Sequence, residues 1–284
     1  MGVQVDLMAS PHFSHRTLLP ATLSASWLPT CKRILLIHPK RLYQVLMVSN
    51  REIVAVDEFV NSLDINPFVF LRLVIQKESR IQQPYAQTQV VLSTPGYQIM
   101  PTEFAYTGKL IYRHMQQGSN HTDQLETVDF PERDLQLVYQ GNPEYDHLID
   151  VYLGNHEQRH LAEIHLKLQE AFASEHPDHL WVQIFDEQVM ITVCKDGQLH
   201  LSNMYQIRNR KDLWYFVHMA LEVADLDPIT TPCWMMGEWN PDWGTDRVIP
   251  SNVHCQLPTT FLDNLPKAAS SVPYWKFGFL GWLS

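Results

Sequence analysis

Apolar and polar positions follow the same order of elements in two separate stretches of the chain. In the first stretch, apolar runs divided by turn residues predict strands over residues 34–37, 42–48 and 52–56. Asn66-Pro67 is typical of a helix start. The apolar periodicity that follows predicts a helix to about Ile81, and residues 89–93 then read as a buried strand. This stretch therefore predicts an antiparallel meander, a crossover helix and a further strand.

The second stretch repeats this order further along the chain. Its apolar runs predict strands over residues 181–185, 189–194 and 198–205. The last two runs are joined by Asp196-Gly197, a dipeptide typical of a tight hairpin turn. Asn209 is placed to cap a helix that runs to about Leu226, and another strand follows over residues 233–236.

The corresponding elements of the two stretches lie about 145 residues apart, although the residues themselves are not alike. Two such units would form two similar α/β lobes with a cleft between them. The alternative is that meander-and-helix units recur by chance in α/β proteins. We predict an N-terminal extension over residues 1–30, a first repeat over 31–175 and a second repeat over 176–284.

The composition fits a globular protein, because 45% of the residues are apolar and 18% are charged. The formal net charge is −10, which argues against a nucleic-acid surface, since phosphate binding needs clustered Lys and Arg. The most basic stretch, residues 207–211, reads as a solvated helix start. The four cysteines form no Cys-x-x-Cys pair, so we expect free thiols.

Neither a secretory signal nor an apolar stretch of the roughly 20 residues needed for a membrane-spanning helix is recognisable. We therefore expect a cytoplasmic protein without a transmembrane segment. The region from Val272 to Leu283 is rich in aromatic residues. This aromatic tail either packs back onto its own fold or docks a protein partner, whose identity is unknown.

Residues 180–238 contain short motifs that resemble the signature of a family of uncharacterised bacterial proteins. These motifs are Asp196-Gly197-Gln198-Leu199, Ser202-Asn203, Asp212-Leu213-Trp214-Tyr215, Leu226-Asp227-Pro228 and Gly237-Glu238. A weaker match lies in residues 90–104, and the resemblance as a whole spans residues 33–238. It implies an actin-like, duplicated ribonuclease H-like fold with two lobes, similar to that of pilus-assembly and type II secretion proteins. It carries over no catalytic residues.

An actin-like ATPase holds ATP between two phosphate hairpins, each with an Asp-x-Gly core. Glycines let backbone N–H groups approach the phosphates, and the aspartates position magnesium and the attacking water. The first hairpin turn of this chain, residues 38–41, has neither Asp nor Gly, and Pro39 removes a backbone donor. Lys40 and Arg41 remain as side chains able to meet an anion.

The second hairpin turn has Asp186 where the metal-positioning aspartate would lie, but glycine is missing and Glu187 would repel phosphate. On the adenosine side a glycine pair is usual, and only Gly237 is present. The candidate nucleotide-binding residues are therefore Asp186, Gly237 and Lys40, with no catalytic residue and no metal ligand. We expect no ATP turnover and no bound cofactor, ATP with magnesium being disfavoured. The cleft is either open with Asp186 facing it or filled by side chains such as Glu187 and Arg41.

His156-Glu157-Gln158-Arg159-His160 matches the His-Glu-x-x-His motif of zinc peptidases. On a helix, both histidines would share a face and the glutamate would act as general base. Arg159, however, would place a cation beside the metal. We predict instead that His156 and His160 lie near the start of a surface helix, whose inner face is formed by Leu161, Ile164, Leu168 and Phe172.

Two functional hypotheses of different classes follow. The favoured one is a non-catalytic scaffold or interaction protein that keeps the two-lobed frame and has lost turnover. The alternative is a divergent ATP-binding protein that assists envelope, pilus or secretion assembly, an analogy at the level of the fold. A zinc metallopeptidase built on His156, Glu157 and His160 is a remote third reading.

Overall fold

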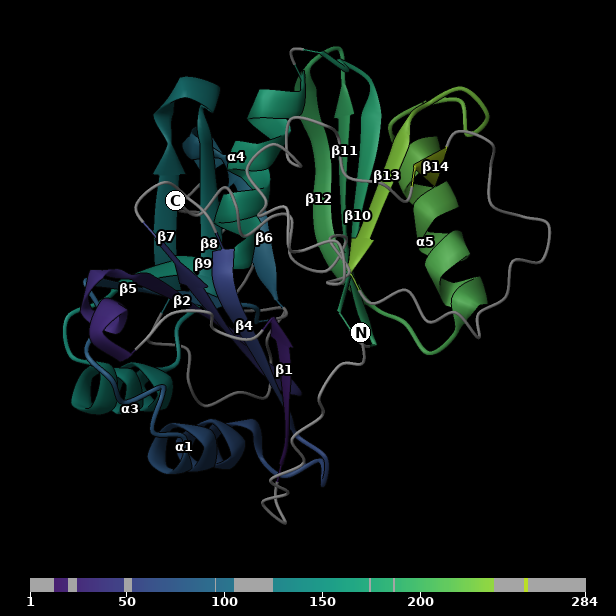
Figure 1. Ribbon diagram of the computed structural model, residues 1–284. Helices are drawn as coiled ribbons and strands as arrows, with labels where there is room; N and C mark the ends of the chain where they lie inside the picture. Colours follow the sequence, from purple (N-terminus) through teal and green to yellow (C-terminus); the bar gives the residue numbers. More distant parts are fainter. Residues whose placement is uncertain are drawn as a thin grey trace.

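The computed structural model describes residues 13–19, 25–48, 53–94, 96–104, 125–173, 175–185, 187–237 and 253–254. Within these ranges the strands form three sheets, and helices pack against the two larger ones (Figure 1). The largest sheet is built from residues 14–160 and the five-stranded sheet from residues 179–254. The expected α/β architecture is therefore present.

The first sheet has six strands in the spatial order β1-β4-β3-β2-β5-β9. Their bounds are β1 Ser14–Leu19, β4 Ile53–Val60, β3 Arg41–Met47, β2 Lys32–His38, β5 Gln87–Leu92 and β9 Glu157–His160. The first four run antiparallel to their neighbours, whereas β5 pairs parallel with β2 and β9 pairs parallel with β5.

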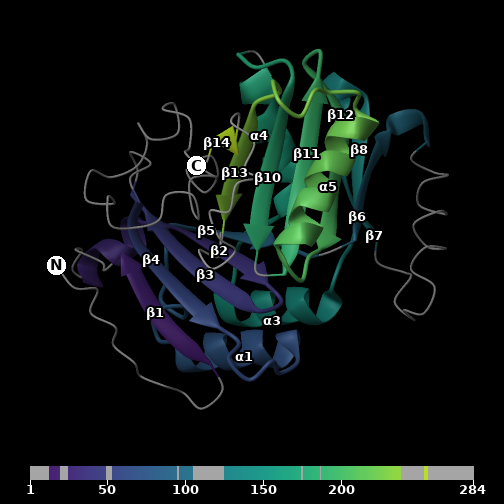
Figure 2. The same ribbon diagram turned by 90° about the vertical axis from the view of Figure 1, so that its right-hand side faces the viewer.

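Both faces of the first sheet are buried. Helices α1 (Pro67–Lys77) and α3 (Pro143–Leu153) lie next to each other and cover one face, where Leu35 and Ile37 pack (Figures 1 and 2). Ile34 and Leu36 point to the opposite face and share a core with helix α4 (Leu161–Ala173). Burial on both sides explains why residues 34–37 are an unbroken apolar run instead of an alternating one.

The second sheet has five strands in the order β12-β11-β10-β13-β14. Their bounds are β12 Gln198–Gln206, β11 Gln188–Lys195, β10 His179–Phe185, β13 Cys233–Gly237 and β14 Val253–His254. Helix α5 (Arg210–Val223) covers the face on which Val182 and Ile184 lie. Trp181 and Phe185 point to the other face and join the core that includes Ile34 and Leu36.

The two halves share one pairing scheme. In the order β2-β3-β4-α1-β5, the first strand pairs antiparallel with the second, the second with the third, and the first pairs parallel with the strand after the helix. The order β10-β11-β12-α5-β13 has the same pairings. The predicted succession of strands and helices is confirmed in both halves.

Both crossover helices end three or four residues before the predicted position. Helix α1 ends at Lys77 because Glu78 turns to extended backbone, with φ −90° and ψ 102°. Helix α5 ends at Val223 because Asp225 adopts a left-handed conformation, with φ 52°. The N–H of Leu226 then bonds back to the last turn, as in a Schellman motif.

The sequence pattern did not predict the third sheet, whose strands have the order β6-β8-β7. Their bounds are β6 Tyr97–Pro101, β8 Leu135–Gln140 and β7 Leu125–Phe130. No residue of β7 is fully buried, and its apolar residues Leu125, Val128 and Phe130 do not follow the strict alternation typical of a strand. The sheet lies beside β12 (Figure 2), where Tyr97 Oη is 3.1 Å from Ser202 Oγ. Three 3₁₀ segments complete the described elements, Ala25–Thr30, Thr102–Phe104 and Pro131–Arg133.

Part of the predicted N-terminal extension belongs to the first sheet. Strand β1 pairs antiparallel with β4, and Phe13 is buried against Phe59 and Phe70. The predicted repeat boundaries remain predictions, and the aromatic tail from Val272 to Leu283 lies outside the described residues.

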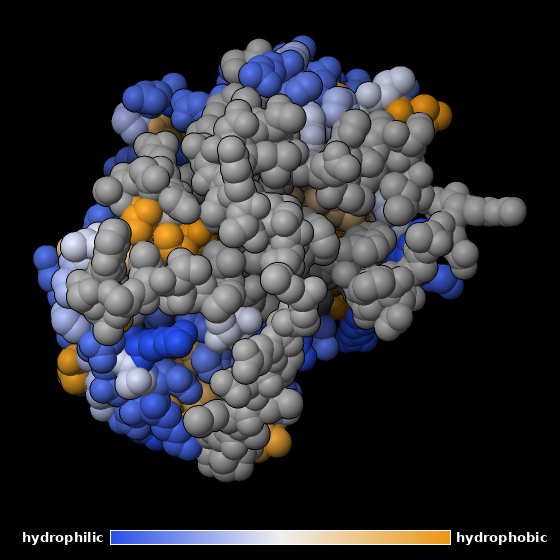
Figure 3. All heavy atoms as spheres, in the orientation of Figure 1, coloured by the Kyte–Doolittle hydropathy of each residue, from blue (hydrophilic) through white to orange (hydrophobic). Residues whose placement is uncertain are grey.

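On the face drawn in Figure 3, the described surface is mostly hydrophilic, with a few separate apolar areas. Large apolar side chains are exposed at separate places in both halves, including Val151, Tyr215 and Ile229. Among the described helices, none combines the length and the hydropathy of a membrane-spanning segment.

Candidate functional site

Two hairpin turns from different halves of the chain contact each other. His38 ends β2 and Lys40 lies in the turn that follows, whereas Phe185 ends β10, Glu187 lies in the next turn and Gln188 begins β11. His38 Nε2 lies 3.1 Å from Gln188 Oε1, and Lys40 Nζ lies 3.0 Å from Glu187 Oε2. The rings of His38 and Phe185 stack with centroids 5.9 Å apart. We call these five residues the hairpin junction.

The junction has a buried and an exposed part. His38 is only 4% exposed. The backbone N–H of Lys40 donates to His38 Nδ1, so Nε2 of the neutral ring carries the proton and donates to Gln188. The side chains of Lys40 and Glu187 are 39% and 57% exposed, and an ion pair as exposed as this contributes at most about 1 kcal/mol. The junction therefore combines a buried hydrogen bond with a solvent-screened ion pair.

Glu187 has a second donor besides Lys40. Gln206 Nε2 lies 3.4 Å from the same carboxylate oxygen, and the backbone carbonyl of Glu187 accepts from the N–H of Ile207. These contacts hold the Glu187 carboxylate beside the first hairpin turn. A negative charge fixed there repels an approaching phosphate.

Arg41 pairs with a buried carboxylate of its own sheet. Its Nη1 donates to Glu58 Oε1 at 2.5 Å, and Glu58 lies fully buried on β4. Of the two side chains expected to fill the cleft, Glu187 therefore contacts the opposite hairpin, whereas Arg41 stabilises a buried carboxylate of its own sheet. Removing Arg41 would leave that charge without this partner.

The other two candidate nucleotide-binding residues are Asp186 and Gly237. Asp186 lies outside the described residues, so its position toward a nucleotide remains a prediction. Gly237 ends β13 with φ +101°, paired in register with Ile184. A Cβ on Gly237 would lie 1.9 Å from the carbonyl oxygen of Ile184. The close approach of two strands accounts for this glycine without a ligand.

The prediction that His156 and His160 lie near the start of a surface helix is only partly right. Helix α4 does follow the motif and buries Leu161 and Ile164 as expected, whereas the side chains of Leu168 and Phe172 lie outside the described part of the chain. Residues 157–160 form strand β9, which pairs with β5, and α4 begins only at Leu161.

The α-carbons of two residues four positions apart in extended chain are separated by about 13 Å, and the ring nitrogens of these two histidines contact different groups. His156 Nδ1 lies 2.8 Å from the carbonyl oxygen of Gly154, whereas His160 Nε2 contacts Thr94 and His160 Nδ1 accepts from the N–H of Ala162. The motif therefore lacks the shared helical face on which two such histidines bind one zinc ion.

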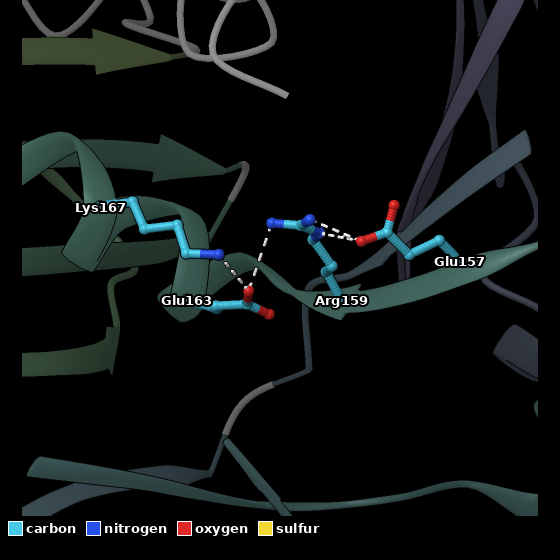
Figure 4. A network of polar contacts seen from close by, with 4 residues as sticks. All are labelled: Glu157, Arg159, Glu163 and Lys167. Carbon is cyan, nitrogen blue, oxygen red and sulfur yellow. Dashed lines mark hydrogen bonds and ion pairs between the residues drawn. The ribbon is translucent and has the colours of Figure 1, made fainter. Parts of the chain in front are cut away.

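The side chains of the motif have other roles. Arg159 binds the would-be general base, since its Nε donates to Glu157 Oε1 at 2.8 Å (Figure 4). The same guanidinium reaches Glu163 on α4, which also pairs with Lys167. His160 is fully buried against Tyr139.

Burial lowers the pKa of His160 to about 4, so its ring is neutral at physiological pH. Among the described residues, no three His, Cys, Asp or Glu side chains are grouped closely enough to hold one metal ion.

The hairpin junction was only partly predictable. Lys40 and Glu187 were identified as residues able to attract or repel a phosphate. His38 and Gln188 were assigned to the turns without a role, and Phe185 was assigned only to a strand. The sequence held only an indirect indication of their contact. The two stretches have the same order of elements, so the first turn of each stretch is expected at the same place in its lobe. The sequence contains no local pattern for a contact between residues 150 positions apart.

The sequence profile of a family described as "Protein of unknown function (DUF3822)" matches residues 31–246. No curated protein sequence matches the chain at a significant level.

One similar solved structure is a protein from Bacteroides thetaiotaomicron VPI-5482, described as having an actin-like ATPase fold and unknown function. It aligns with this chain with a TM-score of 0.69 and 8% sequence identity, and the alignment covers 78% of this chain and 88% of that one. A chain of a "PilM-PilN type IV pilus biogenesis complex" has a TM-score of 0.60 and 10% identity, covering 87% and 96%. These likenesses confirm the expected actin-like fold.

Proposed function

The chain belongs to this family of proteins of unknown function and has the actin-like fold, and from these two premises we propose that it is a non-catalytic scaffold or interaction protein. In this proposal the chain keeps the two-lobed frame of an actin-like ATPase without the turnover. The observation that carries it is the hairpin junction, in which the turns expected to hold phosphates bind each other.

Four features of the two hairpin turns support the loss of turnover. The first turn has Pro39 in place of a residue with a backbone donor, and neither turn offers the glycine that lets backbone N–H groups approach a phosphate. The Glu187 carboxylate adds a repulsive charge. Lys40, the cation best placed to meet an anion, already has that carboxylate as its partner. Transition-state stabilisation requires donors fixed in advance, and these turns lack them.

The alternative is a divergent ATP-binding protein that assists envelope, pilus or secretion assembly. The structural likeness to a chain of a PilM–PilN complex favours it, because that relative works within an assembly of proteins. The exposed Lys40–Glu187 pair is weak, so a nucleotide that bound Lys40 would need to displace only a small interaction energy. Asp186 would then position the magnesium ion.

A thermal-shift titration distinguishes the two. The unfolding midpoint of the wild-type chain is measured with ATP and with ADP, each with and without magnesium, since any ligand of the folded state raises it by mass action. The scaffold proposal expects no rise at millimolar nucleotide. The same titration on Glu187→Gln tests whether the carboxylate alone excludes the phosphates. Lys40→Ala and Asp186→Ala remove the candidate binding side chains. Lys211→Ala is the matched control for Lys40→Ala, because Lys211 is an exposed lysine on α5.

A magnesium-dependent rise that disappears in Lys40→Ala and Asp186→Ala, but persists in Lys211→Ala, would overturn the scaffold proposal and establish the alternative. If the rise appears only in Glu187→Gln, the fold retains a nucleotide site that the native carboxylate blocks. That result supports a scaffold derived from a nucleotide-binding ancestor.

A further inference from the structure

A pocket of about 390 Å³ opens at the edge of the first sheet, between the start of β5 and the segment that leads into β9. Its lining is mainly polar and includes Arg33, Tyr85, Thr88, Asn155, His156 and Glu157. The volume lies in the range of pockets that hold small molecules, about 300–1,000 Å³. Arg33 lies near the start of β2, whereas the hairpin junction begins at His38 at the other end of that strand. The pocket is therefore separate from the junction.

The wall of this pocket contains a buried guanidinium. Arg33 is 2% exposed, and its Cζ lies 4.5 Å from the centroid of the Tyr85 ring. One terminal nitrogen donates to the carbonyl of Ile81, and the other donates to Thr88 Oγ1 at 2.9 Å. Nε is buried and finds no hydrogen-bond partner in the described part of the chain. The fork of donors is thus only partly used.

Arg33 also lacks a countercharge within the described ranges, where no carboxylate forms an ion pair with it. Burial lowers its pKa to about 10, so the side chain still carries its charge at neutral pH. Glu157 lines the same pocket, but its carboxylate binds Arg159. A buried charge without a partner is costly, and an Arg fork suits bidentate contact with a carboxylate or a phosphate.

We propose that this pocket binds a small organic molecule through a carboxylate or phosphate group, which meets the Arg33 guanidinium. The polar side chains around the opening, Asn155 and His156 among them, supply further hydrogen-bonding groups for the rest of the ligand. Occupancy provides the negative charge that the described surroundings of Arg33 do not.

The test uses two probes, sodium succinate for the carboxylate and sodium phosphate for the phosphate, each compared with sodium chloride at equal ionic strength. Thermal shift and calorimetry are carried out on the wild-type chain, on Arg33→Met and on Arg72→Met. Arg72 is the matched control because it also lies over an aromatic ring, that of Phe68, but is exposed on α1. Lys40→Ala excludes binding at the hairpin junction.

One of the two probes is expected to raise the unfolding midpoint of the wild type, Arg72→Met and Lys40→Ala alike. Arg33→Met is expected to bind that probe at least about tenfold more weakly, because it loses charge-assisted hydrogen bonds. Without the probe, Arg33→Met should be as stable as the wild type or more stable, because it replaces a buried charge with an apolar side chain. The probe that acts identifies the group that the pocket accepts.

A second variant leaves Arg33 in place. Ala86 is exposed and also lines the pocket, so Ala86→Phe narrows the pocket from its rim. This variant should lose the probe effect while unfolding at the wild-type midpoint in chloride. The proposal is overturned if neither probe exceeds chloride, or if Arg33→Met and Ala86→Phe respond to the probes as Arg72→Met does.

Discussion

Gly237 combines a backbone conformation and a close contact that together exclude a side chain. Its φ of +101° falls where L-residues are rare, and an added Cβ would overlap the carbonyl of Ile184. Gly197, in the turn between β11 and β12, also has a positive φ, of +73°, but has open space where a Cβ would lie. Comparing the two glycines separates the cost of backbone strain from the cost of steric overlap.

We predict that Gly237→Ala destabilises the chain by about 3 kcal/mol, because strain at a positive φ is added to the displacement of β13 from β10. Gly197→Ala should cost only about 1 kcal/mol, from strain alone. Chemical denaturation of both variants measures the difference. Equal losses of stability in the two variants would contradict this prediction. They would mean that β13 can move to accept a side chain without cost, so that the close contact with Ile184 is not the reason for a glycine at position 237.

Strand β9 is the element whose sequence and structure disagree most. Its four residues, Glu157 to His160, are all polar, and nothing in that pattern indicates a strand. These residues form a strand because they pair parallel with β5. The ion pair between Arg159 and Glu163 then joins the end of the strand to α4 (Figure 4). Tertiary pairing therefore overrides a motif that would be read as a metal site on a helix.

For this element we predict that zinc does not bind through the motif. Calorimetry with zinc chloride should give the same heat for the wild type, His156→Ala and the doubly changed His156→Ala/Glu157→Gln chain. His160→Asn should lower the unfolding midpoint, because it replaces a fully buried ring stacked on Tyr139. A one-to-one zinc site abolished by His156→Ala would contradict the assignment of residues 157–160 to a strand.

At the scale of the whole molecule, one core joins the two large sheets. Ile34 and Leu36 from the first sheet, Trp181 and Phe185 from the second and Leu161 from α4 belong to a single buried cluster. Buried histidines flank this core. Burial lowers the pKa of His160 to about 4, of His165 to about 3 and of His179 to about 4, in each case because the charged ring is desolvated.

These histidines predict a loss of stability in mild acid. Well above the ordinary histidine pKa of about 6.5 they are neutral in both the folded and the unfolded chain and have no effect. As the pH falls from 6.5 toward 4, only the unfolded chain binds protons at these sites, so the free energy of unfolding decreases. Urea titrations at several pH values measure the slope. His165→Leu should flatten that slope, whereas replacing His218, on the exposed part of α5, should not. An unchanged slope in His165→Leu would contradict the prediction.

The sequence alone determined most of the two units that share one pairing scheme. Apolar runs, turn dipeptides and Asn caps are local signals, and they correctly predicted β2 to β5 with α1 and β10 to β13 with α5. Asn66 and Asn209 accept the backbone N–H groups that caps are expected to accept. Within the candidate site, the same local reading identified the two turns and the missing glycines.

Only the tertiary structure decided how distant segments meet. Strands β7 and β9 have weak local patterns, because β7 is half-exposed and β9 is short and polar, and both depend on their neighbours for hydrogen bonds. His38 and Gln188 meet because two separately formed sheets pack on one core, and side-chain periodicity within either segment carries no information about that contact. Local periodicity reports which face of an element is buried, whereas contacts across the core depend on which elements bury it.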